Sequence, residues 1–322
     1  MFDFHIHIAR LPYAKQLIQS LLNRNYDFVT IACEPWEWKV VVELKKIFST
    51  GLKPLKTAYG IHPMIAQQAT KDTFAKLREI LKEDKRAMVG EAGIDKRYPG
   101  YDDGTQDSVF LEQAKLALEF QRDLQIHCVG DYMRVLKLLE KAGYESDALT
   151  DRAQGPQSNR KLSRPIFHRF GGNLSVVKKA LPYGTLFSLH ADSFRKKSTA
   201  AAIPHIPQER VFFETDADET FAQRIVDRNV ATSSATTDPG TESGMTNSVE
   251  SGMTSSEESG MTNSVESGMT SNEESGMTSS AESVILTLAE GKDPEQYTPE
   301  ECASELESRL ESVRAAYAKC RE

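Results

Sequence analysis

The chain opens with Phe2-Asp3-Phe4-His5-Ile6-His7-Ile8, an apolar stretch that carries two histidines at alternate positions. The alternation predicts a strand, because residues two apart in an extended strand point to the same side. His5 and His7 should therefore project together, and they could hold one metal ion through their ring nitrogens. Two ligands rarely complete a catalytic metal site, so the pair predicts further ligands elsewhere in the chain.

Seven more strand candidates follow the first, and helical patterns fill most of the intervals between them. The eight candidates lie at 2–7, 27–32, 55–60, 86–91, 124–128, 164–168, 184–189 and 211–215. Apolar spacing predicts helices at 12–23, 105–122 and 131–142, shorter ones near 172–181 and 195–203, and a charged helix with one apolar stripe over 299–320. This alternation predicts an α/β fold, a (β/α)8 TIM barrel, in which chemistry gathers at the C-terminal strand ends.

The sequence holds 322 residues, whereas such a barrel needs about 250. Residues 242–281 are five tandem octapeptides that each begin with ESGMT and offer one Met as their sizeable apolar side chain. Burial of one Met cannot offset about 1–2 kcal/mol of backbone ordering per residue, so we expect a disordered low-complexity insertion. A Met-studded docking strip and a small stacked β-structure are the alternatives. The predicted organisation is a barrel over 1–230, the insertion over 231–282 between strand 8 and the C-terminal helices, and helices that complete the barrel over 283–322.

The net charge of −8 comes from one segment. Residues 242–282 hold eight Glu and no Lys or Arg, and the remaining 39 acidic side chains balance 39 basic ones. No strongly basic domain indicates nucleic-acid binding, so a nuclease interpretation must rest on the site. The four cysteines lack CxxC spacing, and we find neither a secretory signal nor an apolar run that could span a membrane, so we expect a cytoplasmic protein. A closed barrel leaves no sheet edge to pair, which favours a monomer without an obligate protein partner.

Polar residues recur where the predicted strands end. Six groups at the ends of five strands fit this description: His5 and His7 after strand 1, Glu91 after strand 4, His127 after strand 5, His168 after strand 6 and Asp216 after strand 8. One such histidine alone is more often a hydrogen-bonded residue than a ligand, but the set favours metal binding. Six ligands exceed the three of an ordinary catalytic zinc site and indicate two ions bridged by Glu91. The donors suit Zn²⁺, Mn²⁺ or Fe²⁺, and a carboxylate-richer shell would favour Mg²⁺.

These motifs resemble the TatD family of metal-dependent deoxyribonucleases, which belongs to the amidohydrolase-like TIM barrels. The matching stretches follow the family order over residues 1–230: FDFHIHI (2–8), GIHP (60–63), GEAGID (90–95), QDSVFLEQAKLALEF (106–120), IH (126–127), HRFGG (168–172) and ETDAD (214–218). The resemblance implies two divalent ions, Mg²⁺ or similar. The first would be held by His5, His7, Glu91 and Asp216, and the second by Glu91, His127 and His168. It also implies that Asp216 orients or deprotonates the attacking water and that the substrate is DNA, often cut from a 3′ end.

Three more polar residues lie near the predicted rim. We interpret His62 of the GIHP motif as a group that contacts phosphate or stabilises the transition state, which makes it a third candidate catalytic residue beside Asp216 and Glu91. The alternative is that His62 only shapes a turn, because a residue before proline is pushed out of the helical region. His190 follows strand 7 and could also face the rim, whereas Asp95 is expected to order a loop rather than bind metal.

The departures from the family pattern concern substrate contacts rather than metal ligands. Val129 stands where the family usually carries an arginine, Asp218 replaces a proline, and Arg169 replaces a common cysteine, with a side chain that could point away from the site. Metal-dependent hydrolysis is therefore better supported than DNA as the substrate. Hydrolysis of a C–N or C–O bond and a degenerate metal-binding barrel are the alternative functions. Many relatives with the first activity bridge their ions with a modified lysine at the end of strand 4, and Glu91 in that place favours phosphodiester chemistry.

Overall fold

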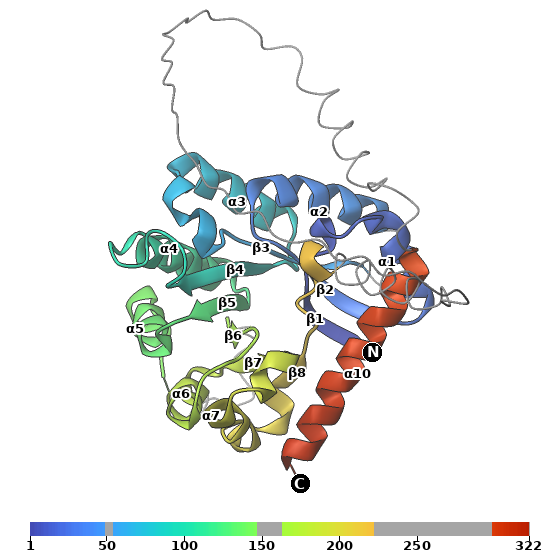
Figure 1. The fold of residues 1–322 in the computed structure, drawn as a ribbon. Helices are drawn as coiled ribbons and strands as arrows, with labels where there is room; N and C mark the ends of the chain where they lie inside the picture. The colour runs from blue at the N-terminus through green and yellow to red at the C-terminus, as the bar shows by residue number, and fades with distance from the viewer. Residues whose placement is uncertain (49–53, 147–162, 222–297, 322) are drawn as a thin grey trace, which may run out of the picture.

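A computed structural model describes residues 1–48, 54–146, 163–221 and 298–321 (Figure 1). The predicted insertion at 231–282, with its octapeptides, lies outside the described residues. Eight parallel strands form one sheet in chain order. They are β1 (Phe2–Ile6), β2 (Asp27–Ala32), β3 (Lys56–Tyr59), β4 (Met88–Asp95), β5 (Leu124–Val129), β6 (Pro165–Phe167), β7 (Leu186–Leu189) and β8 (Val211–Phe213).

The sheet closes where the chain after β8 meets β1. The Asp216 N–H donates to the carbonyl of His5 at 3.0 Å, and the His7 N–H donates to the carbonyl of Ala217 at 2.9 Å. The buried Asp3 carboxylate strengthens this seam, because it accepts hydrogen bonds from the backbone N–H of Thr215 at 3.0 Å and from its hydroxyl at 2.5 Å. The predicted (β/α)8 TIM barrel is confirmed.

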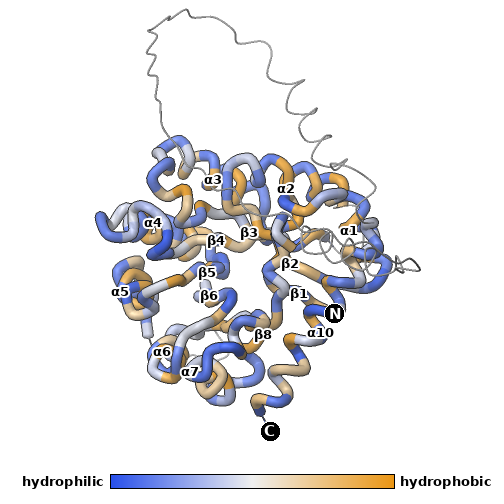
Figure 2. Tube along the Cα trace, in the orientation of Figure 1, coloured by the Kyte–Doolittle hydropathy of each residue, from blue (hydrophilic) through white to orange (hydrophobic). Residues whose placement is uncertain are grey.

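Helices surround the sheet on the outside (Figure 1). They are α1 (Ala14–Asn23), α2 (Pro35–Phe48), α3 (Lys71–Glu83), α4 (Thr105–Phe120), α5 (Tyr132–Ala142), α6 (Leu174–Ala180), α7 (Lys197–Ala200) and α10 (Pro299–Arg321). Short 3-10 turns are η1 (Ile8–Arg10), η2 (Pro63–Gln68), η4 (Leu181–Tyr183), η5 (Ala191–Phe194), η6 (Ile203–His205) and η7 (Gln208–Arg210). Along the helices, hydrophobic and hydrophilic residues alternate in Figure 2, as expected for amphipathic helices on a sheet.

The C-terminal helix α10 packs against α1 and β8. Its buried face includes Leu306, Leu310, Val313 and Tyr317, which is the predicted apolar stripe. The last described residues thus pack against the first helix of the chain, and α10 covers the barrel next to the seam between β8 and β1.

The hydrophobic core has two layers. The smaller cluster includes Phe4, Val29, Ile31, Ile166 and Leu186. These residues come from strands on opposite sides of the barrel, so they can meet only in its interior. The larger cluster packs between the sheet and the helices. The interior of the barrel is apolar at the level of Phe4. The predicted metal ligands begin with the next residue of β1, His5.

Candidate metal centre

All six predicted ligands converge in the part of the barrel toward which the strands run, five of them at or just after a strand end. They come from β1 and the residue after it (His5, His7), β4 (Glu91), β5 (His127), the residue after β6 (His168) and the segment after β8 (Asp216). One detail differs from the prediction, because β4 runs on to Asp95 and Glu91 lies in the middle of the strand.

β1 changes the facing of its side chains just before the histidines. Phe4 belongs to the interior cluster, and in a regular strand its neighbour His5 would face outward. The register between β1 and β2 shifts between Asp3 and Ile6, and Ile6 packs in the outer cluster. His5 and His7 consequently point inward as well, which is how irregular strands re-aim side chains at barrel rims.

β4 carries the same kind of irregularity beside Glu91. Its register with β5 shifts between Val89 and Ala92. Gly93 then allows the two strands to approach closely, because a Cβ at this position would lie 1.8 Å from the carbonyl oxygen of His127. The shift and the close approach together bring the side chain of Glu91 beside that of His127.

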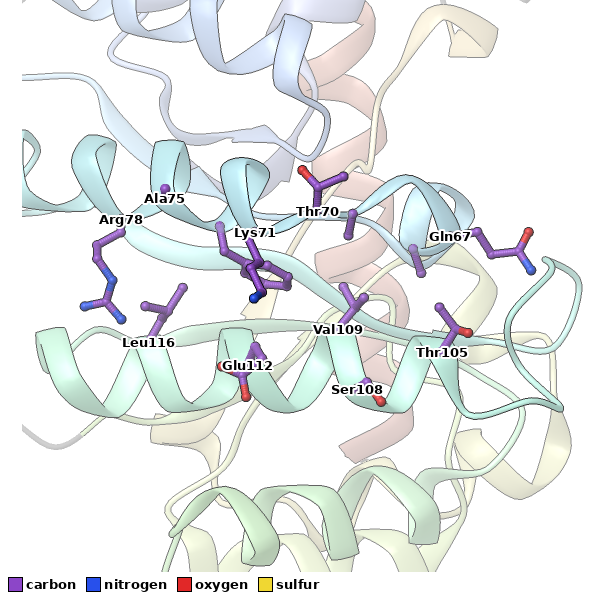
Figure 3. Close-up of a pocket in the computed structure, with 13 residues that line it drawn as sticks. Gln67, Thr70, Lys71, Ala75, Arg78, Thr105, Ser108, Val109, Glu112 and Leu116 are labelled. Atoms are coloured by element: carbon purple, nitrogen blue, oxygen red, sulfur yellow. The ribbon is translucent and has the colours of Figure 1, made fainter.

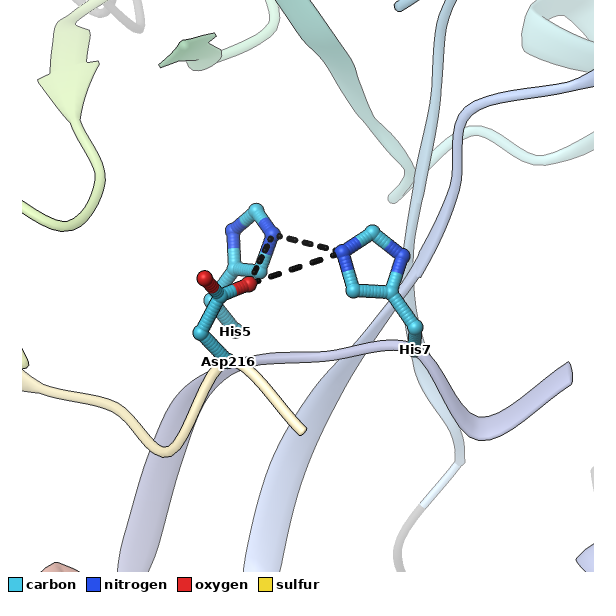
Figure 4. Close-up of side chains that lie close together, drawn as sticks. All are labelled: His5, His7 and Asp216. Carbon is cyan, nitrogen blue, oxygen red and sulfur yellow. Dashed lines mark hydrogen bonds and ion pairs between the residues drawn. The ribbon is translucent and has the colours of Figure 1, made fainter. Parts of the chain in front are cut away.

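His5, His7 and Asp216 form the first group of donor atoms (Figure 4). The Nε2 atoms of the two histidines are 3.3 Å apart, and Oδ1 of Asp216 lies 3.6 Å from each of them. Two ligands that each lie about 2.1 Å from a metal, at angles near 90–120°, are separated by about 3.0–3.6 Å. The spacing of the three atoms therefore suits ligands of one ion.

Glu91, His127 and His168 form the second group. Oε1 of Glu91 lies 2.5 Å from Nδ1 of His127 and 2.7 Å from Nε2 of His168, and these two nitrogens are 3.2 Å apart. The nitrogens thus have the same ligand-to-ligand spacing as the first group.

Glu91 connects the two groups through different oxygens. Its Oε1 faces the second group, whereas its Oε2 lies 3.4 Å from Nε2 of His5 and 3.5 Å from Nε2 of His7. A carboxylate with one oxygen toward each group has the arrangement of a bridging ligand between two ions about 3.5–4 Å apart. Histidine and carboxylate donors in this pattern fit a pair of divalent ions.

Two of the histidines hydrogen-bond their other ring nitrogen to an outer oxygen, and a third, His168, lies near an outer carboxylate without a hydrogen bond among the described residues. The pairs are His5 Nδ1 with Oε1 of Gln125 at 3.0 Å, His127 Nε2 with Oδ2 of Asp95 at 2.9 Å, and His168 Nδ1 with Oε1 of Glu214 at 3.4 Å. An outward N–H leaves the lone pair of the inner nitrogen for a metal and fixes the orientation of the ring. The outer acceptors therefore prepare the inner nitrogens to act as ligands.

We did not predict from the sequence that Gln125, Asp95 and Glu214 contact the histidines. Asp95 orders the loop after β4, as expected, by accepting the Arg97 N–H at 2.9 Å, but it also holds His127. Gln125 and Glu214 were not singled out. Their positions could have indicated this contact. Gln125 lies two residues before His127 on the same face of β5, and Glu214 lies two residues before Asp216.

Burial opposes the ionisation of both carboxylates, but their neighbours outweigh it. The imidazoles of His168 and His127, whose own pKa values are raised, hold the pKa of Glu91 well below its usual range. Contact with His7 and the nearby His168 hold the pKa of Asp216 well below its usual range. Both groups are therefore carboxylates at neutral pH, the form that binds metal or accepts a proton.

His62 lies beside the second group and has a different hydrogen-bonding pattern. Its Nδ1 accepts the backbone N–H of Met64 at 3.1 Å, so the proton of the neutral ring is on Nε2. Nε2 lies 3.3 Å from Nδ1 of His127 and 3.6 Å from Oε1 of Glu91. Burial lowers the pKa of His62 to about 3, so the ring is neutral and directs an N–H donor at the centre. The same contact to Met64 caps η2, so the residue also shapes the turn after β3.

Arg169 does not point away from the site. Its Nη1 donates to Oδ2 of Asp216 at 2.7 Å, and its Nη2 pairs with Asp192. His190 takes a structural role, because its Nδ1 accepts the backbone N–H of Asp192 at 3.2 Å and caps η5. The rim of the barrel thus carries a cation in direct contact with a predicted ligand.

Two hollows accompany the barrel. One of about 370 Å³ lies between the loops after β5 and β6, beside the rim, and is lined by residues that include Gly171, Lys179 and Lys196. Another of about 710 Å³ lies on the outside, between α3 and α4, with Lys71, Arg78 and Glu112 in its lining (Figure 3). The first is lined by the segments that follow the strands of His127 and His168, and none of the six predicted ligands lines it; the second belongs to the outer helical layer.

The fold and the site define a class: parallel α/β barrels that collect histidines and carboxylates at the C-terminal ends of their strands. The sequence matches the TatD related DNase family over residues 2–232, so the chain belongs to that family.

Individual relatives are distant. A 3′-5′ ssDNA/RNA exonuclease TatD of Cronobacter sakazakii is 27% identical over 161 residues, which cover 49% of this chain and 55% of that protein. An uncharacterized metal-dependent hydrolase of Buchnera aphidicola is 22% identical over 233 residues, which cover 67% of this chain and 80% of that protein. The chain spans about half the length of the curated exonucleases it matches.

The crystal structure of YJJV, a TATD homolog from Escherichia coli, superposes with a TM-score of 0.55 at 20% identity, covering 67% of this chain and 79% of that one. This likeness supports the barrel fold. Within the described part of the chain, no helix is both long and apolar enough to cross a lipid bilayer.

Proposed function

We propose that this protein is a two-metal phosphodiesterase that hydrolyses DNA or short oligonucleotides from the 3′ end. The position of Glu91 carries the proposal, because its two oxygens face two separate donor groups. Membership of the TatD related DNase family supports the reaction, and the distant exonuclease relative supports the substrate and the polarity.

Each donor group would hold one divalent ion, Mg²⁺, Mn²⁺ or Zn²⁺. His5, His7 and Asp216 with one oxygen of Glu91 form the first set, and His127 and His168 with the other oxygen form the second. Two such ions would lower the pKa of a bound water and neutralise charge on the phosphoryl oxygens.

The residues around the two sets supply proton transfer and hydrogen bonding. Asp216 is ionised, belongs to the first set and accepts the proton of the attacking water. The Nε2–H of His62 donates to a phosphate oxygen and stabilises the charge that develops there. Because His62 is neutral, it donates this hydrogen bond without repelling the ions.

The first test uses single-stranded DNA labelled at its 5′ end, incubated with purified protein and Mg²⁺ or Mn²⁺. We expect products that shorten progressively from the 3′ end and no reaction in excess chelator. His127→Ala removes a ligand of the second set, and we expect activity to fall by about a hundredfold or more.

The matched control is His205→Ala, which makes the same chemical change at an exposed residue in η6. This variant should cleave like the parent. Equal activity in His127→Ala and the parent, or cleavage that survives chelation, would contradict the proposal.

A further inference from the structure

Arg169 is an exposed cation in direct contact with the buried donor groups. The guanidinium donates to Oδ2 of Asp216, whereas Oδ1 of the same carboxylate faces His5 and His7. The Arg169 side chain is 46% exposed and that of Asp216 is 11% exposed. A ligand that approaches the carboxylates from solvent therefore reaches the guanidinium first.

The position of Arg169 is fixed by its backbone and by a second carboxylate. Its N–H donates to Oε1 of Glu214 at 2.5 Å, in a left-handed conformation with φ of 44°. Its Nη2 pairs with Asp192 on the side away from Asp216. Within the described residues these two side-chain contacts use two of the five guanidinium donors, and the fork geometry of the others suits a phosphate.

The loop that follows Arg169 lines the hollow beside the rim, although Arg169 itself does not line it. Gly171, two residues after Arg169, lines it together with Lys179 and Lys196. Asp131 is the acidic residue of the lining, and its carboxylate caps α5 by accepting the N–H groups of Met133 and Arg134. The two lysines leave the hollow with a net positive charge.

We propose that Arg169 binds a phosphate of the substrate strand next to the scissile one, and that the hollow lined by Lys179 and Lys196 accepts the phosphates that follow. The inference rests on the proposed function, since it assigns a path for the polynucleotide whose end is cleaved. The strand runs from the metal centre over Arg169 toward α5 and α6. Contacts of this kind position the backbone and carry no base sequence preference.

The test measures binding of a single-stranded oligothymidylate with phosphorothioate linkages, which resist cleavage, by fluorescence anisotropy at several salt concentrations. Arg169→Gln is expected to weaken binding about tenfold. It should also reduce the slope of log affinity against log salt by about 0.7, the value for one lost contact to a single strand. Arg169→Lys keeps the charge and should restore most of the slope.

Lys179→Gln combined with Lys196→Gln should reduce the slope further, by about 0.7 per contact. The matched control is Arg78→Gln, which removes the same charge from α3 at 39% side-chain exposure, in the outer hollow of Figure 3. This control should bind like the parent.

The outcomes separate the two proposals. A parent protein that neither binds nor cleaves the oligonucleotide overturns the proposed function. A parent that does both, with Arg169→Gln retaining the same affinity and salt slope, overturns the phosphate path alone. A fall in kcat with unchanged affinity and slope also overturns it, because Arg169 would then act only by positioning Asp216.

Discussion

Two histidines of the candidate centre, His5 and His127, are held from two sides. His127 shows this most clearly, because Nδ1 contacts Glu91 and Nε2 contacts Asp95. The outer carboxylate selects the tautomer in which Nδ1 is free to bind a metal. The metal affinity of the proposed site would therefore depend on Asp95, which is not itself one of the proposed ligands.

Asp95→Ala should reduce metal affinity about 10- to 100-fold while the protein stays folded, because His127 loses the acceptor that orients it. Isothermal titration of the metal-free protein with Mn²⁺ measures the change. Asp102→Ala is the control, since Asp102 is exposed in the loop after β4. Unchanged affinity in Asp95→Ala would show that the ring is oriented by other contacts.

At this scale the sequence predicted the residues that converge and missed those that support them. The histidines and acids stood out because each is unusual at the end of a buried strand. Gln125 and Glu214 resemble any polar residue within a strand or after it, and only the closed barrel shows which ring nitrogen each one faces. The Arg169–Asp216 pair joins two loops that are distant in sequence, so no local pattern could indicate it.

Single carboxylates also join whole elements of the outer layer. Asp84, at the end of α3, accepts a hydrogen bond from the hydroxyl of Thr57 on β3 at 2.6 Å and pairs with Lys45 on α2. Its other oxygen accepts the backbone N–H groups of Arg86 and Ala87, each at 3.1 Å. One side chain thus links two helices, a strand and the turn that leads into β4.

Asp84→Asn is expected to lower the free energy of unfolding by about 1–3 kcal/mol at neutral pH. Burial raises the pKa of Asp84, but the contacts with Lys45 and Thr57 outweigh it and hold the pKa below its usual value. The carboxylate therefore stabilises the fold above a pH of about 4, and this contribution is lost as pH falls through the folded-state pKa.

Urea denaturation of parent and variant, repeated at decreasing pH, should show the difference shrinking in acid. Glu83→Gln serves as the control because Glu83 is exposed on the same helix. A difference that is independent of pH would mean that the ionised form of Asp84 contributes nothing.

Elements were predicted well where their pattern was strong. All eight strands appear, seven of them close to their predicted limits, and so do the helices α1, α4, α5 and α10. Helices α2 and α3 were not assigned individually. The extension of β4 to Asp95 was missed, because the register shift near Glu91 interrupts the alternation on which strand prediction relies.

At the scale of the molecule, the described core draws on the barrel and on α10, which stand on either side of the octapeptide segment in the sequence. Deleting 242–281 is expected to leave the midpoint of thermal unfolding nearly unchanged. Nuclease activity should change less than about tenfold, which corresponds to about 1.4 kcal/mol, because salt screens the eight Glu of 242–282 beyond about 8 Å.

A second variant keeps the length of the segment and replaces its Glu residues with Gln. It separates the effect of the segment's charge on nuclease activity from the effect of its length. Loss of cooperative unfolding in the deletion would refute the prediction that the segment is an insertion outside the core. The division into 1–230, 231–282 and 283–322 remains a prediction.

The seam between β1 and the segment after β8 has a consequence for biosynthesis. His5 and His7 leave the ribosome early, whereas Asp216, which hydrogen-bonds to the backbone of His5, is translated near the end of the barrel. A nascent chain that lacks this segment has its histidines but not the neighbour that completes their donor group. If the first set holds an ion, as we propose, that ion can bind its full set of ligands only after the segment that follows the last strand has been made. Binding of the ion would then require a closed barrel.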